Sequence, residues 1–241
     1  MRLEEAHWVR DTLLRFVTGA GPADRIALNL GSGTRKMREV LKPHVNEMTL
    51  QPLSDAGFRI VHSDMFAGDG IELQGDLFDP AFQQQLQQLQ PALVYFCNIL
   101  EHLDRRHRLD VPHILDAVVP PGGLLLITAP LSYPYHADPI DTYYRVTPQQ
   151  IAELFPGYQV LNQAAVNCGN YGEEFRRGSP GRRIRKVLRL LVPFVRPKRW
   201  LTHAHRFLWM NRPYRISCVL MRKPPAAPGA NAVIPATDTG H

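Results

Sequence analysis

The chain has 241 residues, of which 44% are hydrophobic, and its formal net charge is +6. This size and apolar content predict one globular domain with a core of its own. The sequence contains no uninterrupted apolar run long enough to cross a bilayer, and its first segment, MRLEEAHWVRDTLLRF, is charged throughout. We therefore expect neither a spanning helix nor a signal peptide, and we predict a cytoplasmic protein.

Helical and strand-like segments alternate in the order that builds a parallel sheet covered by helices. Apolar residues recur at helical spacing over 3–18, and RIALNL, at 25–30, is the first predicted strand. Residues 35–43 predict a helix that ends at Pro43, and 46–57 predict a loop or a short extra strand. The next predicted elements are strands at 58–66 and 70–78, a helix at 80–90, a strand at 92–100, a helix at about 108–119 and a strand at 122–130.

Two further strands are predicted at 158–166 and 214–223, and a basic, amphipathic insertion at about 170–212 separates them. The expected fold is a doubly wound, Rossmann-like α/β sheet that is mostly parallel, with an antiparallel final strand and helices on both faces. Residues 1–223 would form this single domain. Residues 224–241 are rich in Pro, Gly and Ala and have almost nothing to bury, so this tail is predicted to be disordered.

The first predicted strand runs directly into a glycine turn. Gly31 and Gly33 allow backbone conformations and close approaches that a side chain would block, and a helix after the turn points its N–H groups at any ligand above it. A dinucleotide fingerprint would need a glycine at Lys36, which argues against a nicotinamide cofactor. The turn by itself allows either a ligand site or a purely structural bend.

Polar side chains stand where the later strands end: Asp64, Asp76 and Asn98, with Glu101 and His102 just beyond. In an α/β sheet, ligands bind outside the carboxyl ends of the strands. A carboxylate at Asp64 can accept both hydroxyls of a ribose, and one at Asp76 can accept from an adenine amino group. Together these residues indicate a nucleoside site. Glu101 is expected to cap backbone donors, and His102 to pack against the edge of the ligand.

Residues 25–165 resemble the class I S-adenosylmethionine-dependent methyltransferases. The resemblance is carried by LNLGSGT, HSD, GDLFD, NILEHLD and PGGLLLITAP, in that order. LEHL and PGG are typical of members that methylate small molecules, and YHADPIDTYYRVTPQQI is similar to a segment of methyltransferases found with polysaccharide biosynthesis. The resemblance implies transfer of a methyl group from S-adenosylmethionine (SAM) to a small or lipid-linked acceptor, with a sugar intermediate as the first candidate.

The resemblance also assigns the cofactor contacts. Gly31, Ser32 and Gly33 of the glycine turn would contact the methionine part. Asp64, at the end of the second strand, would bind the ribose, and Asp76 and Leu77, after the third strand, would bind the adenine. Asn98, at the end of the fourth strand, would lie near the sulfonium. Two positions depart from the family pattern. Asn29 replaces the usual acid and can hydrogen-bond the cofactor's amino group without supplying charge. Arg35 replaces a frequent third glycine and either meets the methionine carboxylate or points to solvent.

Methyl transfer from a sulfonium is an in-line displacement on an activated carbon, so positioning can supply much of the catalysis. A general base is needed only for a poorly acidic hydroxyl. His136 suits such a base near neutral pH, and Asp138 or Asp141 can orient it. The competing interpretation is a loop that only closes over the core. The cysteines and histidines lack metal-ligand spacing, so no metal is expected.

The charge is distributed unevenly along the chain. Residues 1–174 carry 13 Lys/Arg and 21 Asp/Glu, whereas residues 175–241 carry 15 and 1. Residues 182–210 interleave Arg and Lys with large apolar residues, as helices lying on anionic lipid do. Three roles stay open for this segment: a substrate lid packed on the domain, a peripheral membrane surface, or a nucleic-acid surface, the last being least favoured.

Two functional hypotheses follow from these patterns. The first is a methyltransferase for a small or lipid-linked acceptor, which the acids at the strand ends favour. The second is a noncatalytic module of methyltransferase-like fold that binds a nucleotide or anchors a partner at membranes, which Asn29 and Arg35 favour.

Overall fold

The computed structural model describes residues 1–17, 25–135, 140–194 and 197–226. Within these residues, seven strands form one sheet in the order β3-β2-β1-β4-β5-β7-β6. The strands are β1 (Arg25–Leu30), β2 (Phe58–Asp64), β3 (Leu73–Gln74), β4 (Leu93–Cys97), β5 (Leu124–Ser132), β6 (Gln159–Asn167) and β7 (Arg215–Arg222). β7 runs antiparallel to β5 and β6, and the other neighbouring pairs are parallel. The predicted doubly wound sheet with an antiparallel final strand is confirmed.

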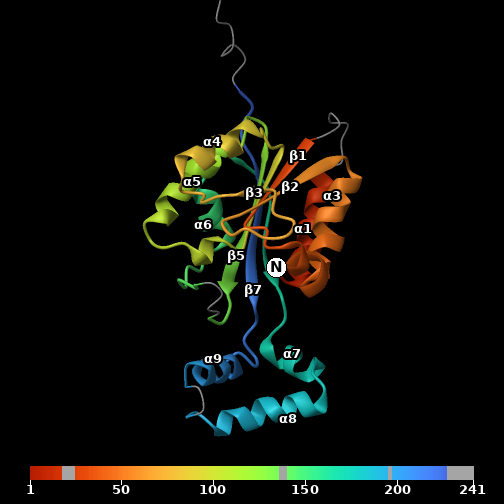
Figure 1. Ribbon diagram of the computed structural model, residues 1–241, viewed down its shortest axis with the longest axis vertical. Helices are drawn as coiled ribbons and strands as arrows, with labels where there is room; N and C mark the ends of the chain where they lie inside the picture. The colour runs from red at the N-terminus through yellow and green to blue at the C-terminus, as the bar shows by residue number, and fades with distance from the viewer. Residues whose placement is uncertain (18–24, 136–139, 195–196, 227–241) are drawn as a thin grey trace, which may run out of the picture.

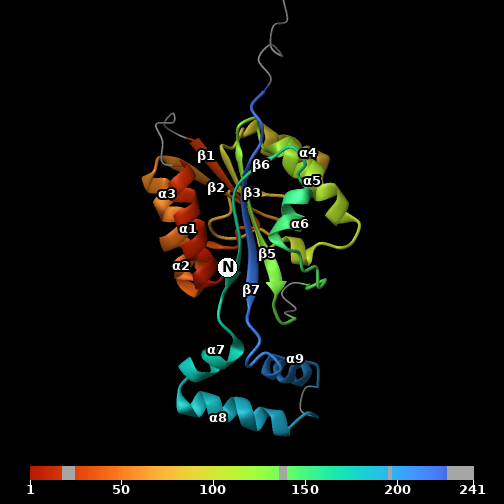
Figure 2. The ribbon, with the colours of Figure 1, turned by 180° about the vertical axis from the view of Figure 1, so that it is seen from behind.

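Helices cover both faces of this sheet. They are α1 (Leu3–Val17), α2 (Pro43–Val45), α3 (Gln51–Asp55), α4 (Pro80–Gln88), α5 (His107–Val118) and α6 (Pro148–Glu153). The first three lie on one face and the last three on the other (Figures 1 and 2). Alternate residues of β4 supply the two cores: Leu93 and Tyr95 pack towards α1, and Val94 and Phe96 pack towards α5. A strand buried on both faces needs apolar residues without interruption, which is why this segment is recognisable in the sequence.

The region between β1 and β2 differs from the prediction. A π-helical segment η1 (Met37–Leu41), α2, a second π-helical segment η2 (Asn46–Leu50) and α3 follow one another, so Pro43 does not end the helical stretch. Residues 46–57 are therefore largely helical, and not a loop or a strand. Proline fits the first turn of a helix because its missing N–H would have no intrahelical partner there, and Pro43 and Pro52 both stand at helix starts.

Two shorter elements also differ. The strand predicted at 70–78 is reduced to β3, because Asp79 starts α4 and accepts a hydrogen bond from the backbone N–H of Ala81 at 2.9 Å. Helix α6 was not predicted, although Thr147 and Gln150 form a capping box at its start.

Between β6 and β7 the chain leaves the sheet and forms a helical insertion. It comprises α7 (Tyr171–Arg177), α8 (Pro180–Leu188), a 3-10 turn η4 (Arg189–Leu191) and α9 (Pro197–Phe207). Figures 1 and 2 show these helices beyond the carboxyl ends of β5 and β6. Tyr171, Tyr214 and Cys168 belong to a small core that joins the insertion to the sheet, whereas α8 buries none of its own residues. No helix in the described part of the chain has the length and apolar character to span a bilayer.

Candidate functional site

The glycine turn lies at the carboxyl end of β1, in the middle of the sheet. Gly31 and Gly33 both have positive φ, +61° and +62°, a conformation that favours glycine. A Cβ atom on Gly31 would stand 2.8 Å from Cδ1 of Ile99, so a side chain here would displace that of Ile99. The backbone N–H of Ser32 donates to the carbonyl of Ser63 at 3.0 Å, which ties the turn to β2.

Asp64, the last residue of β2, is brought directly to this turn. Its Oδ2 accepts from the N–H of Gly33 at 2.9 Å, and its Oδ1 accepts from the N–H of Phe66 at 3.1 Å. Each bond uses one acceptor position, so both carboxylate oxygens keep capacity for further donors. Asp76 follows β3, which pairs with the end of β2, and it is exposed, while Leu77 packs partly against the core. The predicted ribose and adenine residues therefore stand on neighbouring strand ends.

Asn98 stands at the end of β4 in a strained backbone conformation, with φ of +55°. Its Nδ2 donates to Oε1 of Glu5 at 2.8 Å, and Oγ1 of Thr128 donates to the same oxygen at 2.6 Å. The other oxygen of Glu5 accepts from the backbone N–H of Arg2 at 2.8 Å. Sequence reasoning missed Glu5, a completely buried carboxylate on α1 that joins the start of the chain to β4 and β5.

Asn29 makes its polar contact with the neighbouring strand. Its Nδ2 lies 3.3 Å from Nδ1 of His62, the residue paired with it across β1 and β2. Burial, together with the charges of Arg38 and Arg35, lowers the pKa of His62 from 6.5 to about 4. A neutral imidazole at physiological pH can accept this hydrogen bond.

Arg38 is a second residue that sequence reasoning missed. It is only 4% exposed, and its guanidinium donates to the carbonyls of Gly33 and Gly70, the latter at 3.0 Å. This arginine therefore braces the glycine turn against the loop before β3. Arg35 is exposed and lies 3.4 Å from Asp69 in the same loop. Two cations thus flank the turn.

Glu101 is the most unusual acid of the site. It lies in a 3-10 turn, η3 (Leu100–His102), and is 1% exposed. Burial raises its pKa from 4.5 to about 8, and the nearby charge of Glu5 contributes to the rise. Its Oε2 has no hydrogen-bond partner among the described residues. The Nδ1 of His102 donates to the carbonyl oxygen of Ile140 at 2.8 Å.

The two predicted catalytic residues, His136 and Asp138, lie outside the described residues. The segment that follows is held by a bidentate ion pair between Arg145 and Asp141, with N–O distances of 2.9 and 2.6 Å. Tyr143, with φ of +57°, stacks on Tyr135 at 5.5 Å between ring centroids. The two ends of the segment carrying the predicted base are therefore joined by an aromatic contact.

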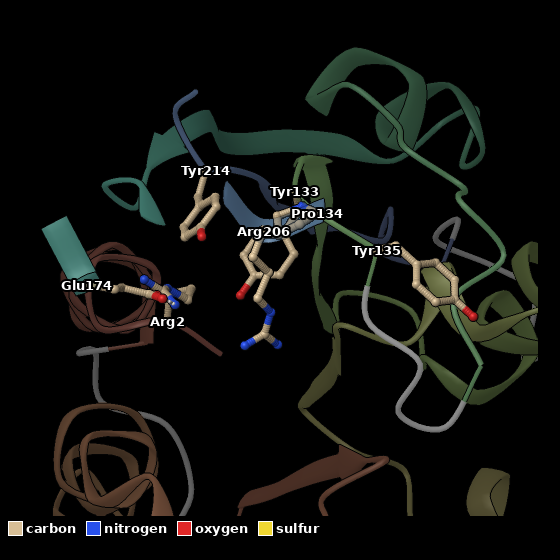
Figure 3. Close-up of a pocket in the computed structure, with 7 residues that line it drawn as sticks. All are labelled: Arg2, Tyr133, Pro134, Tyr135, Glu174, Arg206 and Tyr214. Carbon is tan, nitrogen blue, oxygen red and sulfur yellow. Dashed lines mark hydrogen bonds and ion pairs between the residues drawn. The ribbon is translucent and has the colours of Figure 1, made fainter. Parts of the chain in front are cut away.

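A cavity of about 300 Å³ lies between the carboxyl edge of the sheet and the helical insertion (Figure 3). Three tyrosines, two arginines, one glutamate and one proline line it: Arg2, Tyr133, Pro134, Tyr135, Glu174, Arg206 and Tyr214. These residues come from the position before α1, the segment after β5, α7, α9 and the segment before β7. Arg2 and Glu174 form an ion pair across the wall. In the described part of the chain, no group of three or more His, Cys, Asp or Glu residues could hold a metal ion.

The strand order, the antiparallel β7 and the helices on both faces define a Rossmann-like methyltransferase fold. No family model matches the chain, and no curated protein matches its sequence. The fold is similar to that of a proposed sarcosine dimethylglycine methyltransferase from Galdieria sulphuraria, with a TM-score of 0.54 and 13% identity over 92% of this chain and 85% of the other.

The fold is also similar to that of the (4+2)-cyclase SpnF, with a TM-score of 0.53 and 14% identity over 91% of this chain and 81% of SpnF. The names of these two proteins specify different reactions. The likeness therefore establishes the fold, and the reaction has to be argued from the site.

Proposed function

We propose that this chain is a SAM-dependent methyltransferase that acts on a small or lipid-linked acceptor, with a sugar intermediate of polysaccharide biosynthesis as the first candidate. The observation that carries the proposal is the placement of Gly33, Asp64 and Asn98 at the carboxyl edge of a methyltransferase-like sheet, where Asp64 is hydrogen-bonded to Gly33 and Asn98 to the buried Glu5. In this fold class, the carboxyl edge is where ligands bind.

The donors and acceptors present fit the proposed cofactor. A turn without side chains at Gly31 and Gly33 leaves room for the methionine part, and the carboxylate of Asp64 keeps acceptor capacity for two ribose hydroxyls. The exposed Asp76 is available to the adenine amino group. Arg35 and Arg38 add positive charge beside the turn, which suits the carboxylate of the methionine part.

SAM supplies a methyl group on a positively charged sulfur. The task of the chain is then to hold the acceptor atom in line with that group and to exclude water. Asn98 would line the floor beside the sulfonium, and Glu5 and Thr128 fix its amide. For a hydroxyl acceptor, His136 would take the proton, with Asp138 orienting its imidazole.

We place residues 182–210 at the surface of an anionic membrane, with the enzyme on the cytoplasmic side. A lid would bury the apolar face of α8, but Leu188 is 56% exposed and Leu191, just after it, 71%. Arg and Lys residues alternate with these apolar residues, and the sequence from 175 to 226 contains no Asp or Glu. Apolar side chains combined with unopposed positive charge are the requirements for binding in the plane of an anionic bilayer.

The test is formation of S-adenosylhomocysteine when the protein is mixed with SAM and a panel of acceptors. The panel contains nucleotide sugars, sugar phosphates and polyprenyl-linked sugars, and the Asp64→Ala variant, which should bind SAM more weakly, is the control at subsaturating SAM. The proposal predicts product with at least one sugar-bearing acceptor. Binding of SAM without product from any of them would favour the noncatalytic module.

A further inference from the structure

The cavity between the sheet and the insertion contains a positive charge that no described residue neutralises. Arg2 is paired with Glu174, so these two side chains cancel each other's charge. Arg206 of α9 has no ion-pair partner in the described part of the chain, and it lines the same cavity. Figure 3 shows its guanidinium in the region between the Arg2–Glu174 pair and Tyr135. The cavity therefore has a net positive charge.

The walls beside this charge are aromatic. The rings of Tyr133 and Tyr214 stand 4.8 Å apart between centroids, and the guanidinium of Arg2 lies over the Tyr214 ring at 5.1 Å. Burial raises the pKa of the Tyr133 hydroxyl, and the charges of Arg2 and Arg206 oppose that rise, which places both cations near it. Tyrosine offers a flat apolar face with a polar tip, so these walls suit a ring that also makes hydrogen bonds.

The cavity also adjoins the proposed cofactor site. Glu5 accepts from Asn98 on one side and from the backbone N–H of Arg2 on the other, both at 2.8 Å. One buried carboxylate therefore links the floor of the cofactor site to the wall of the cavity. A compound in the cavity would lie on the same side of the sheet as the carboxyl end of β4, beyond which the methyl group is expected.

We infer that this cavity binds the acceptor, and that the acceptor carries an anionic group, a phosphate or a carboxylate, attached to a ring. Arg206 holds the anion, and the tyrosines contact the ring. A cationic amine is disfavoured because two arginines face one glutamate in the lining. This inference rests on the proposed function, because an acceptor site requires a methyltransferase. Binding of a ligand to the cavity can nevertheless be measured without SAM.

Three probes with the same ring and different charge test the inference: phenyl phosphate, phenyl β-glucoside and phenethylamine. Their affinities are measured by calorimetry on the full chain without SAM. Phenyl phosphate should bind best and phenethylamine should show no saturable binding. The Arg206→Gln variant should bind phenyl phosphate roughly five- to tenfold more weakly, the loss expected for one exposed charge-assisted contact. Arg212→Gln removes the same charge from an exposed position outside the cavity and should bind like wild type.

Equal affinity for phenyl phosphate in wild type and Arg206→Gln would overturn the inference, as would binding of phenethylamine at similar strength. Affinity for SAM, measured in parallel, separates this failure from failure of the proposed function, because Arg206 takes no part in the cofactor site. Phosphatidylcholine vesicles with and without dodecyl phosphate then distinguish the sources of the anion. Displacement of phenyl phosphate only by the dodecyl phosphate vesicles assigns the cavity to a lipid-borne phosphate, and no displacement assigns it to a water-soluble one.

Discussion

The buried carboxyl of Glu101 makes the stability of this protein depend on pH. Its pKa rises from 4.5 to about 8 on burial, so the folded chain keeps a proton that the unfolded chain releases. The free energy of unfolding should therefore fall as pH rises through this range. His62 acts in the opposite direction, but only below pH 6.5, because its pKa is lowered from 6.5 to about 4.

Above pH 6.5 the contribution of Glu101 can thus be measured apart from that of His62. Between pH 6.5 and 8 we expect the wild-type free energy of unfolding to fall by on the order of 1 kcal/mol. Glu101→Gln cannot ionise and should show a flatter profile. Urea unfolding at several pH values gives both curves. Identical slopes for the two proteins would show that Glu101 is ionised in the folded state.

Asp64 gives a second prediction at the scale of one side chain. Asp64→Ala should weaken SAM binding by about 1.5 to 3 kcal/mol, the usual loss for hydrogen bonds to a charged group. The fold should survive, because the two backbone groups that Asp64 accepts from are not deeply buried. Asp55→Ala, an exposed acid on α3, is the matched control. An unchanged calorimetric affinity of Asp64→Ala for SAM would show that another residue binds the ribose.

Individual residues were predictable from the sequence where they follow a strand. The placement of Asp64 and Asn98 at strand ends could be predicted because Asn98 directly follows an apolar run and Asp64 stands three residues after Val61, where another run ends. Glu5 and Arg38 could not, because their partners are distant in the chain: Glu5 meets Asn98 across 93 positions, and Arg38 meets Gly70 across 32. A helical Glu or Arg ordinarily faces solvent, and only the tertiary contacts show that these two are buried.

Helix α8 belongs to the segment that we propose to bind the membrane. If it lies on an anionic membrane, each basic side chain near the surface contributes on the order of 1 kcal/mol, and salt screens this contribution. Binding to phosphatidylglycerol vesicles should be strong at low salt and weak at high salt. A variant with five changes to Gln should lose it: Arg182, Arg183, Arg185, Lys186 and Arg189.

The matched control removes five exposed charges from the α/β domain. It changes to Gln the residues Arg15, Lys42, Arg59, Arg105 and Arg106. This control should sediment with the vesicles like wild type, and both variants should keep wild-type affinity for SAM. Equal losses of vesicle binding in the two variants would show that net charge alone accounts for the binding. Salt-dependent binding to RNA in place of vesicles would support a nucleic-acid surface.

The apolar residues of the same region distinguish a membrane surface from a lid. Ile184, Leu188 and Leu191 are 59%, 56% and 71% exposed. Changing all three to Ala should weaken vesicle binding, since apolar insertion is lost, and should leave the unfolding temperature unchanged, since little packing is removed. A clear fall in the unfolding temperature with vesicle binding intact would indicate that these side chains pack on the protein, as a lid requires.

The elements differ in how far the sequence could define them. The central strands have continuous apolar runs and were predicted within a few residues. The prediction of a loop or strand at 46–57 was wrong. Pro43 was expected to end a helix, but Pro43 and Pro52 both occupy first turns, and burial of Leu50 and Leu53 favours the helix. The insertion was expected from its composition, but its attachment through Tyr171 and Tyr214 depends on contacts that composition does not reveal.

For the whole molecule, the order of elements and the motifs at the strand ends point to one place, the carboxyl edge of the sheet. The glycine turn and the acids stand at that edge, and the cavity lies between the edge and the insertion. The sequence could predict that edge, because the topology of an α/β sheet fixes it. It could not predict the cavity, whose lining combines Arg2, which precedes α1, with residues after β5 and β6 and before β7.

The central claim is that this edge binds SAM. Titration of the full chain with SAM in a calorimeter tests it most directly, with S-adenosylhomocysteine as a competitor and NAD⁺ as the nucleotide control. The account predicts saturable binding at a single site, competition by S-adenosylhomocysteine and no heat from NAD⁺. Bound SAM should also raise the unfolding temperature, because a ligand that binds only the folded state stabilises it. Absence of both heat and stabilisation with SAM, or equal binding of NAD⁺, would contradict the account.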